Sequence, residues 1–433
     1  MEKKFVGRQP MIQWTGHEPP ALLGVAIQLP EQSDEEVAAS LAELGELVTT
    51  AGGRLVKTLV QKRDRADRQS YLGKGKMSEA SALAKAVGAI QIVADDELTG
   101  LQIRRMEEGT GLPVIDRTRV ILEIFARHAT TREGLLQVEL AQVQYVLLRL
   151  AGGYEGFSRQ RGGIGTKGPG ETQIETDRRV LRLRARKLLE ELEEVVRTRE
   201  LQRRKRAERF TPLFSLVGYT NAGKSTLLNA LSGSQVLTND GLFTTLDPTT
   251  RKVELPGGRP AILSDTVGFI RKLPHGLVKA FRATLESVRQ SQVILHVCDV
   301  SNPAVREQIA AVEEVLREMD VLSLERLMVF NKIDLTPGQT FEALRHAYPG
   351  AIFLSARTGE GLDELKERMA AILARDVEEV ELAIPPGEPL LREILAIGRP
   401  RDQHWEPSVV RVRVALPRRF LPVVERFRVA SPR

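Results

Sequence analysis

Residues 218–225 set the fold of this chain and read Gly218-Tyr219-Thr220-Asn221-Ala222-Gly223-Lys224-Ser225. The apolar run Leu213–Val217 precedes them and predicts a buried strand, and residues 226–231 predict the opening of a helix. Backbone N–H groups that the glycines free to turn inward would cradle phosphates at a helix N-terminus, where the helix dipole favours anions. We expect Lys224 to reach the β- and γ-phosphates and Ser225 to ligate Mg²⁺.

A second segment, residues 253–268, contains a further residue expected near the Mg²⁺ ion. The apolar runs Val253–Leu255 and Ala261–Ser264 predict a hairpin. Its second strand ends at residues 265–268, which read Asp265-Thr266-Val267-Gly268. We expect Asp265 to hold the Mg²⁺ shell through water and the N–H of Gly268 to meet a γ-phosphate.

Two further strand ends predict recognition of a guanine base. The first ends in Asn331-Lys332-Ile333-Asp334 and the second in Ser355-Ala356-Arg357. Asp334 would accept two hydrogen bonds from guanine and reject adenine, because a buried carboxylate left unpaired is costly. Backbone N–H groups of residues 355–357 would bind guanine O6. Each short motif alone is weak, since a phosphate-loop match can arise by chance and Asn-Lys-x-Asp also fits a solvated turn. All four motifs follow apolar strands, however, and open α/β sheets bind ligands at that edge. We therefore predict a guanine-nucleotide domain over residues 210–375.

Three segments resemble one branch of the translation-factor-related GTPases. Residues 242–251 resemble switch I of the Obg and HflX branch and read Leu242-Phe243-Thr244-Thr245-Leu246-Asp247-Pro248-Thr249-Thr250-Arg251. Residues 265–270 resemble the HflX switch II, and the glycine-rich residues 162–179 resemble the signature before the HflX GTPase domain. Over most of its length the chain is similar to HflX-type ribosome-associated GTPases.

This resemblance implies the fold class and further site residues. It implies an α/β protein whose P-loop GTPase domain follows a small α/β domain with a long helical hairpin and precedes a small α+β C-terminal domain. It implies nucleotide contacts by Phe243, Thr244, Thr245, Leu246 and Asp247. Thr245 is the expected second Mg²⁺ ligand, with Thr249 as the alternative; the same threonines also fit an ordinary strand edge.

Phe269 departs from the general GTPase pattern. Many GTPases place a glutamine directly after the switch II glycine, where its amide orients the attacking water. A phenylalanine cannot hydrogen-bond that water, so no catalytic residue is assigned. We expect slow hydrolysis of GTP to GDP and phosphate, stimulated by ribosomes.

Composition limits the class of protein. The chain has 433 residues, of which 42% are apolar, and a formal net charge of +6. That length predicts two to three domains. The single cysteine, Cys298, lies in an apolar run and is expected to be a buried strand residue. No apolar run approaches the roughly 18 residues of a membrane span, and the N-terminus lacks a signal-peptide core. We expect a cytoplasmic monomer, with loose membrane association left open.

Residues 21–130, after a tail of residues 1–20, alternate strand-like and helical patterns and predict a small α/β domain with a parallel sheet. Residues 71–76, Tyr71-Leu72-Gly73-Lys74-Gly75-Lys76, lack the full phosphate-loop spacing. We expect a glycine turn before a helix that starts near Ser78, and ATP binding here remains an alternative. The acidic run 95–97 fits a metal site less well than a loop that carries a helix N-cap.

Residues 131–209 predict a helical hairpin with a glycine-rich basic loop at 151–170. Arg159, Arg161 and Lys167 in that loop are candidates for RNA contact, because cations gain affinity for phosphates through counterion release. A disordered linker is the alternative. The resemblance points to RNA of the large ribosomal subunit.

The last region, residues 376–433, predicts a small C-terminal domain. Residues 409–416 alternate apolar and basic side chains as a half-exposed strand does. Basic surface here fits a further RNA contact. For the whole chain we expect a GTP-hydrolysing factor that binds the large (50S) subunit and splits or rescues stalled ribosomes. The alternatives are a signalling GTPase with a protein effector and an N-terminal domain with ATP-dependent RNA-remodelling activity.

Overall fold

The computed structural model describes residues 18–65, 67–152, 169–207, 211–233, 242–243, 249–272, 288–336, 339–375, 377–398 and 400–429. The chain divides into two compact units. The first contains Met1–Val196, Asn239–Asp247 and Gly268–Thr284, and the second contains Arg197–Thr238, Pro248–Val267 and Leu285–Arg433. Two short segments that follow the phosphate loop in sequence therefore belong to the first unit.

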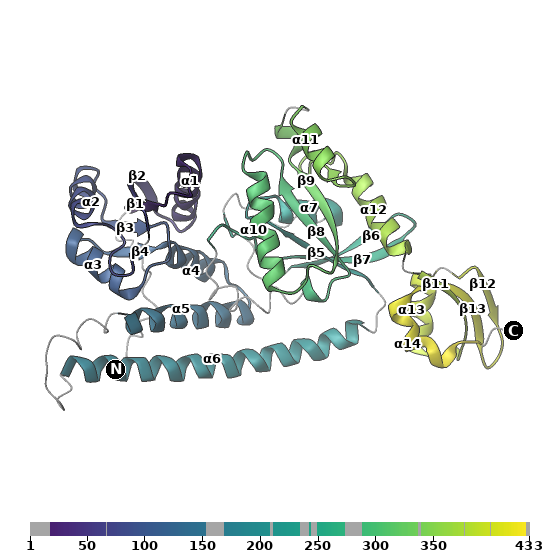
Figure 1. Ribbon diagram of the computed structural model, residues 1–433. Helices are drawn as coiled ribbons and strands as arrows, with labels where there is room; N and C mark the ends of the chain where they lie inside the picture. The colour runs from purple at the N-terminus through teal and green to yellow at the C-terminus, as the bar shows by residue number, and fades with distance from the viewer. Residues whose placement is uncertain are drawn as a thin grey trace. The chain divides into compact units, whose positions relative to one another are not determined.

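The first unit contains a four-stranded parallel sheet in the order β2-β1-β3-β4. Its strands are β1 (Ala21–Gln28), β2 (Arg54–Lys62), β3 (Gln91–Ala94) and β4 (Val114–Asp116). The connecting helices are α1 (Asp34–Thr50), α2 (Lys74–Ala86), α3 (Gly100–Thr110) and α4 (Arg117–His128). Helices α1 and α4 cover one face of the sheet, and α2 and α3 cover the other (Figure 1). The predicted parallel α/β arrangement is confirmed.

Local capping fixes where these helices begin. Ser33 caps α1 in a capping box with Glu36, and Thr99 caps α3 in a capping box with Gln102. The acidic run 95–97 lies in the loop between β3 and α3, as expected, and the residue of that loop that caps α3 is Thr99. Helix α2 begins at Lys74 rather than near Ser78. Its first turn includes Gly75, and glycine disfavours a helix interior, so the sequence pattern concealed that turn.

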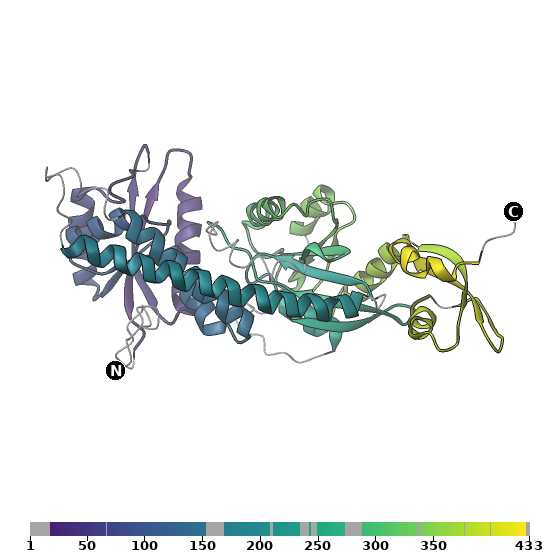
Figure 2. The same ribbon diagram turned by 90° about the horizontal axis from the view of Figure 1, so that it is seen from below.

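Helices α5 (Arg132–Gly152) and α6 (Pro169–Ala207) follow the sheet and form the predicted hairpin. They lie side by side in Figure 1, and Figure 2 shows α6 as one unbroken helix. Leu136, Leu140 and Val143 of α5 pack with Leu188 of α6. Leu135 of α5, by contrast, is 50% exposed.

The second unit contains a six-stranded sheet in the order β10-β9-β8-β5-β7-β6, in which β6 alone is antiparallel to its neighbour. The strands are β5 (Leu213–Gly218), β6 (Thr250–Leu255), β7 (Arg259–Asp265), β8 (Val293–Asp299), β9 (Glu325–Asn331) and β10 (Ile352–Phe353). The helices are α7 (Lys224–Ser232), α10 (Val305–Glu318), α11 (Gln339–Ala347) and α12 (Leu362–Arg375).

Helices pack on both faces of this second sheet. One core contains residues of α7 and α12, and the other contains residues of α10 and the α11–β10 connection (Figure 1). Cys298 lies on β8 and is buried, as expected. Each of the four predicted motifs follows a strand of this sheet, namely β5, β7, β9 or β10. The motifs therefore lie together at the carboxyl edge of the sheet.

The C-terminal region contains the three-stranded antiparallel sheet β11-β13-β12. Its elements are β11 (Val377–Ile384), α13 (Pro389–Gly398), β12 (Asp402–Trp405), β13 (Val410–Pro417) and α14 (Leu421–Val424). Strand β13 alternates buried and outward residues, which confirms the predicted half-exposed strand. The predicted fold class is confirmed as a whole, whereas the divisions at residues 20, 130, 209 and 375 stay predictions. Within the described part of the chain, no helix is both long and apolar enough to cross a bilayer.

Candidate functional site

The loop between β5 and α7 has the close backbone approach that its glycines predict. A Cβ atom on Gly218 would collide with the carbonyl oxygen of Val297, and one on Gly223 would collide with Asn331 Nδ2. Gly223 also has φ +88°, a left-handed conformation that favours glycine. A side chain at either position would therefore force the loop away from β8 and β9.

Lys224 is the buried cation of this loop. It is 7% exposed, and its ammonium donates to the carbonyl oxygens of Gly218 at 3.1 Å and Tyr219 at 2.7 Å. Burial lowers the pKa of Lys224 to about 8, although the Asp265 carboxylate opposes that shift. Two neutral carbonyl groups compensate a buried charge only in part, so an anion such as phosphate fits beside this ammonium.

Ser225 and Asp265 form the predicted metal side of the site. The Ser225 hydroxyl donates to Asp265 Oδ2 at 2.6 Å, and the Thr266 N–H donates to the other carboxylate oxygen at 2.9 Å. The Thr266 hydroxyl is directed away, to the Leu216 carbonyl oxygen at 2.7 Å. A hydroxyl and a carboxylate side by side are the hard oxygen donors that Mg²⁺ prefers, so the donor set fits that ion.

Asn331 joins the phosphate loop to the loop after β10. Its Nδ2 donates to the Ala222 carbonyl at 2.9 Å, and its Oδ1 accepts the Ala356 N–H at 2.9 Å. The Ser355 N–H donates to the Glu360 carbonyl at 3.0 Å. Two of the three N–H groups expected at guanine O6, those of Ser355 and Ala356, thus already donate within the protein.

The other residues of the Asn331 motif lie at the same sheet edge. Lys332 has φ +68° and pairs with Asp299, at the end of β8, across 2.7 Å. Ile333 and Asp334 belong to a single 3₁₀ turn, and Asp334 is exposed to solvent. Sequence reasoning missed Asp299, although its place at a strand end was a signal. Thr220, which the sequence placed in the phosphate loop, has a buried hydroxyl with no hydrogen-bond partner among the described residues.

The residues expected in the two switches fall partly outside the described residues and partly in the first unit. Thr244–Asp247, with the expected metal ligand Thr245, fall outside the described residues, as do Arg159, Arg161 and Lys167 of the RNA-contact prediction. Phe243 is buried in the first unit. Gly268 begins another segment of that unit, after Val267, and Phe269 is only 2% exposed. A buried phenylalanine supports the expectation that this position does not orient water.

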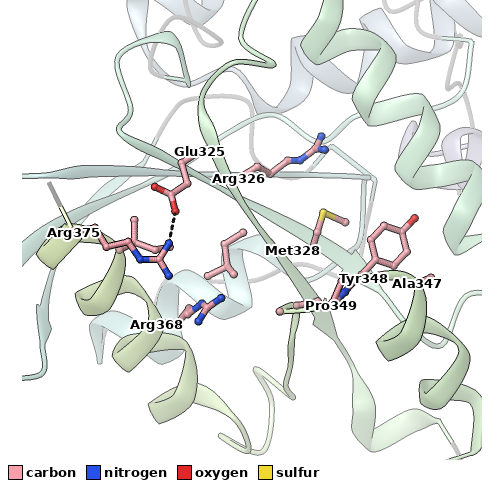
Figure 3. A pocket seen from close by; sticks show the side chains of 12 residues that line it. Glu325, Arg326, Met328, Ala347, Tyr348, Pro349, Arg368 and Arg375 are labelled. Carbon is pink, nitrogen blue, oxygen red and sulfur yellow. Dashed lines mark hydrogen bonds and ion pairs between the residues drawn. The ribbon is translucent and has the colours of Figure 1, made fainter.

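A hollow of about 270 Å³ lies elsewhere on the second unit (Figure 3). It is lined by the start of β9 and by Arg368 and Arg375 of α12, and Arg375 pairs with Glu325 at 3.5 Å. The start of β9 is the end opposite to Asn331. The hollow is therefore separate from the phosphate-loop chemistry.

Known families match three successive parts of the chain. Residues 38–126 match "GTP-binding GTPase N-terminal", residues 128–206 match "GTP-binding GTPase Middle Region", and residues 214–332 match "50S ribosome-binding GTPase". Among solved structures, a GTP-binding protein from the archaeon Sulfolobus solfataricus in complex with GDP is 22% identical. That match covers 81% of this chain and 98% of the other, with a TM-score of 0.40.

Curated relatives are closer in sequence. The GTPase HflX of Caldanaerobacter subterraneus subsp. tengcongensis is 46% identical over 365 residues, which are 84% of this chain and 83% of the relative. The GTPase HflX of Escherichia coli is 41% identical over 383 residues, 87% of this chain and 89% of the relative. Since both relatives are matched over most of their length, this chain belongs to the HflX family of GTPases, which bind and hydrolyse GTP.

Proposed function

We propose that this GTPase binds the large ribosomal subunit in its GTP state and splits or rescues stalled ribosomes. The observation that carries the proposal is the match of residues 214–332 to a family described as 50S ribosome-binding GTPases. The net charge of +6 and the basic glycine-rich loop at residues 151–170 support contact with ribosomal RNA. The protein would act as a monomer in the cytoplasm.

The residues of the phosphate loop would bind the nucleotide. Gly218–Ser225 would surround the phosphates, with the Lys224 ammonium between the β- and γ-phosphates. Asp334 would select guanine, and the N–H of Arg357 would reach its O6. Bound Mg²⁺ would neutralise phosphate charge, held by Ser225 and Thr245, with Asp265 behind it.

Hydrolysis would depend on a partner. Phe269 is buried and offers no hydrogen bond to the attacking water. A ribosome that supplied or positioned the missing group would accelerate hydrolysis, and a supplied arginine accelerates other GTPases by about 10³ to 10⁵. After hydrolysis the contact of Gly268 with the γ-phosphate and that of Thr245 with Mg²⁺ would be lost, and the protein would leave the ribosome.

The test is GTP hydrolysis by the full chain with and without purified large subunits at several salt concentrations. We expect strong stimulation that weakens as salt rises, because RNA contact releases counterions. Small ribosomal subunits at equal concentration are the control. Fast hydrolysis that ribosomes do not change would contradict the proposal and point to a protein effector.

A further inference from the structure

Lys272, four residues after Gly268, forms an ion-pair cluster at the carboxyl end of β3. Its ammonium donates to Asp95 Oδ2 and to Asp96 Oδ1, each at 2.6 Å. The side chain of Asp95 is 1% exposed and that of Lys272 is 32% exposed. All three residues belong to the first unit. Water and salt screen such a pair less than a pair on the surface.

Other side chains hold the two carboxylates of this cluster in place. Asp95 accepts hydrogen bonds from Arg117 Nη1 at 2.8 Å and from the Ser40 hydroxyl at 2.6 Å. Asp96 Oδ2 accepts the Tyr71 hydroxyl at 2.6 Å. Because these hydrogen bonds already hold the two carboxylates, forming the ion pair restricts only one further long side chain, that of Lys272.

The cluster lies where sheets of this type receive ligands. The chain passes from β1 to β2 on one side and returns to pair β3 on the other side of β1. The carboxyl ends of β1 and β3 therefore flank a topological switch point, the usual ligand position of an open parallel sheet. Here the ligand is a lysine of the same chain, 177 residues away from Asp95.

Neighbouring residues of both switch segments are held in the same unit. Phe269 and Ile270 are 2% and 3% exposed. The rings of Phe243 and Phe125 meet edge to face with centroids 4.7 Å apart. The Leu242 N–H donates to the hydroxyl of Thr50, the last residue of α1, at 3.3 Å.

We propose that the Lys272 cluster holds the switch II segment on the N-terminal α/β domain in the GDP state and opens when GTP binds. The inference rests on GTP binding and on the proposed contact between the Gly268 N–H and the γ-phosphate. Only three residues separate Gly268 from Lys272, so a Gly268 drawn toward the γ-phosphate displaces the lysine. GDP has no γ-phosphate and leaves the cluster closed.

A zero-length carbodiimide reagent tests the cluster directly, because it joins a lysine and a carboxylate that are already in contact. In the full chain with GDP, mass spectrometry should find an amide between Lys272 and Asp96. With a non-hydrolysable GTP analogue the yield should fall several-fold. Equal yields in the two states, or no such amide in either, would overturn the proposal.

Nucleotide affinity gives a second readout. A closed cluster opposes the binding of GTP but not the binding of GDP. Lys272→Met should therefore raise the affinity for the GTP analogue relative to GDP by about 5-fold or more, which is the low end of typical coupling between two sites. Lys252→Met, at an exposed lysine of β6, is the matched control and should change neither affinity. If Lys272→Met does not fold, Asp96→Asn tests the same pair. An unchanged ratio of the two nucleotide affinities in folded variants would refute the proposed role of the cluster. It would leave the proposal of ribosome binding unaffected.

Discussion

At the scale of single residues, Asn331 shows what a short motif can and cannot predict. The motif placed it beside the guanine base. It gave no sign that the same side chain also holds Ala222 of the phosphate loop, because that contact joins residues 109 positions apart. Lys272 is a clearer case, since nothing near it in sequence indicates Asp95 or Asp96. Local spacing predicts backbone motifs, whereas side-chain partners depend on the folded sheets.

Lys224 leads to a prediction about protons. Burial lowers its pKa to about 8, and a bound phosphate favours the charged form and raises that pKa. Nucleotide binding near pH 8 should therefore take up about half a proton at this group, and near pH 6 almost none. Calorimetry of GDP binding in two buffers of different ionisation enthalpy measures the uptake. Equal proton uptake at the two pH values would contradict the assignment.

His296 leads to a prediction about stability. It is 1% exposed on β8, and burial, aided by the charges of Arg326 and Lys224, lowers its pKa to about 3. The unfolded state binds the proton near pH 6.5, so the stabilisation is complete above pH 6.5 and is lost as pH falls toward 3. At pH 5 the loss should reach about 2 kcal/mol.

Urea unfolding at pH 7.5 and pH 5 measures this loss for His296. The variant His296→Gln cannot titrate there, so its unfolding should depend less on pH than that of the parent chain. An identical pH dependence in the two proteins would assign the effect to other groups.

At the scale of elements, two adjacent leucines of α6 differ in their exposure to solvent. Leu188 is fully buried against α5, and Leu189 is 44% exposed. The apolar pattern predicted both helices but not which leucines face each other, because the facing side depends on how the partner helix packs. For the same reason the pattern does not show that Leu135 of α5 is half exposed.

These two leucines form a matched pair for measurement. Leu188→Ala should destabilise the hairpin by about 2–5 kcal/mol, since it leaves a cavity in a packed core. Leu189→Ala should change the unfolding free energy by less than about 1 kcal/mol. Chemical denaturation followed by circular dichroism compares them. Equal losses would mean that the two helices do not pack through Leu188.

At the scale of the whole molecule, the sequence predicted the order of the parts because each part carries its own pattern. The prediction that the two switch segments lie beside the phosphates stays a prediction, and Gly268–Lys272 group with the first unit. No local pattern reports that grouping, since it arises from contacts between segments more than a hundred residues apart.

The glycine-rich loop provides the test at this scale. Replacing Arg159, Arg161 and Lys167 by glutamine keeps the loop length and removes three charges. The slope of ribosome affinity against salt, both on logarithmic scales, should fall by about 2 to 3, and GTP affinity should stay unchanged. Co-sedimentation with large subunits measures the first, and fluorescent nucleotide binding measures the second. Loss of GTP affinity would mean that the loop is structural.

Helix α6 has a mechanical consequence of its own. It contains 39 residues, so it extends about 58 Å from the end of the glycine-rich loop to the start of the GTPase domain. Over that length, a tilt of the helix axis by about 5° displaces the far end by about 5 Å. If the proposed ribosome contact holds, a ribosome bound at the glycine-rich loop would receive such a tilt as a displacement rather than as a change in affinity.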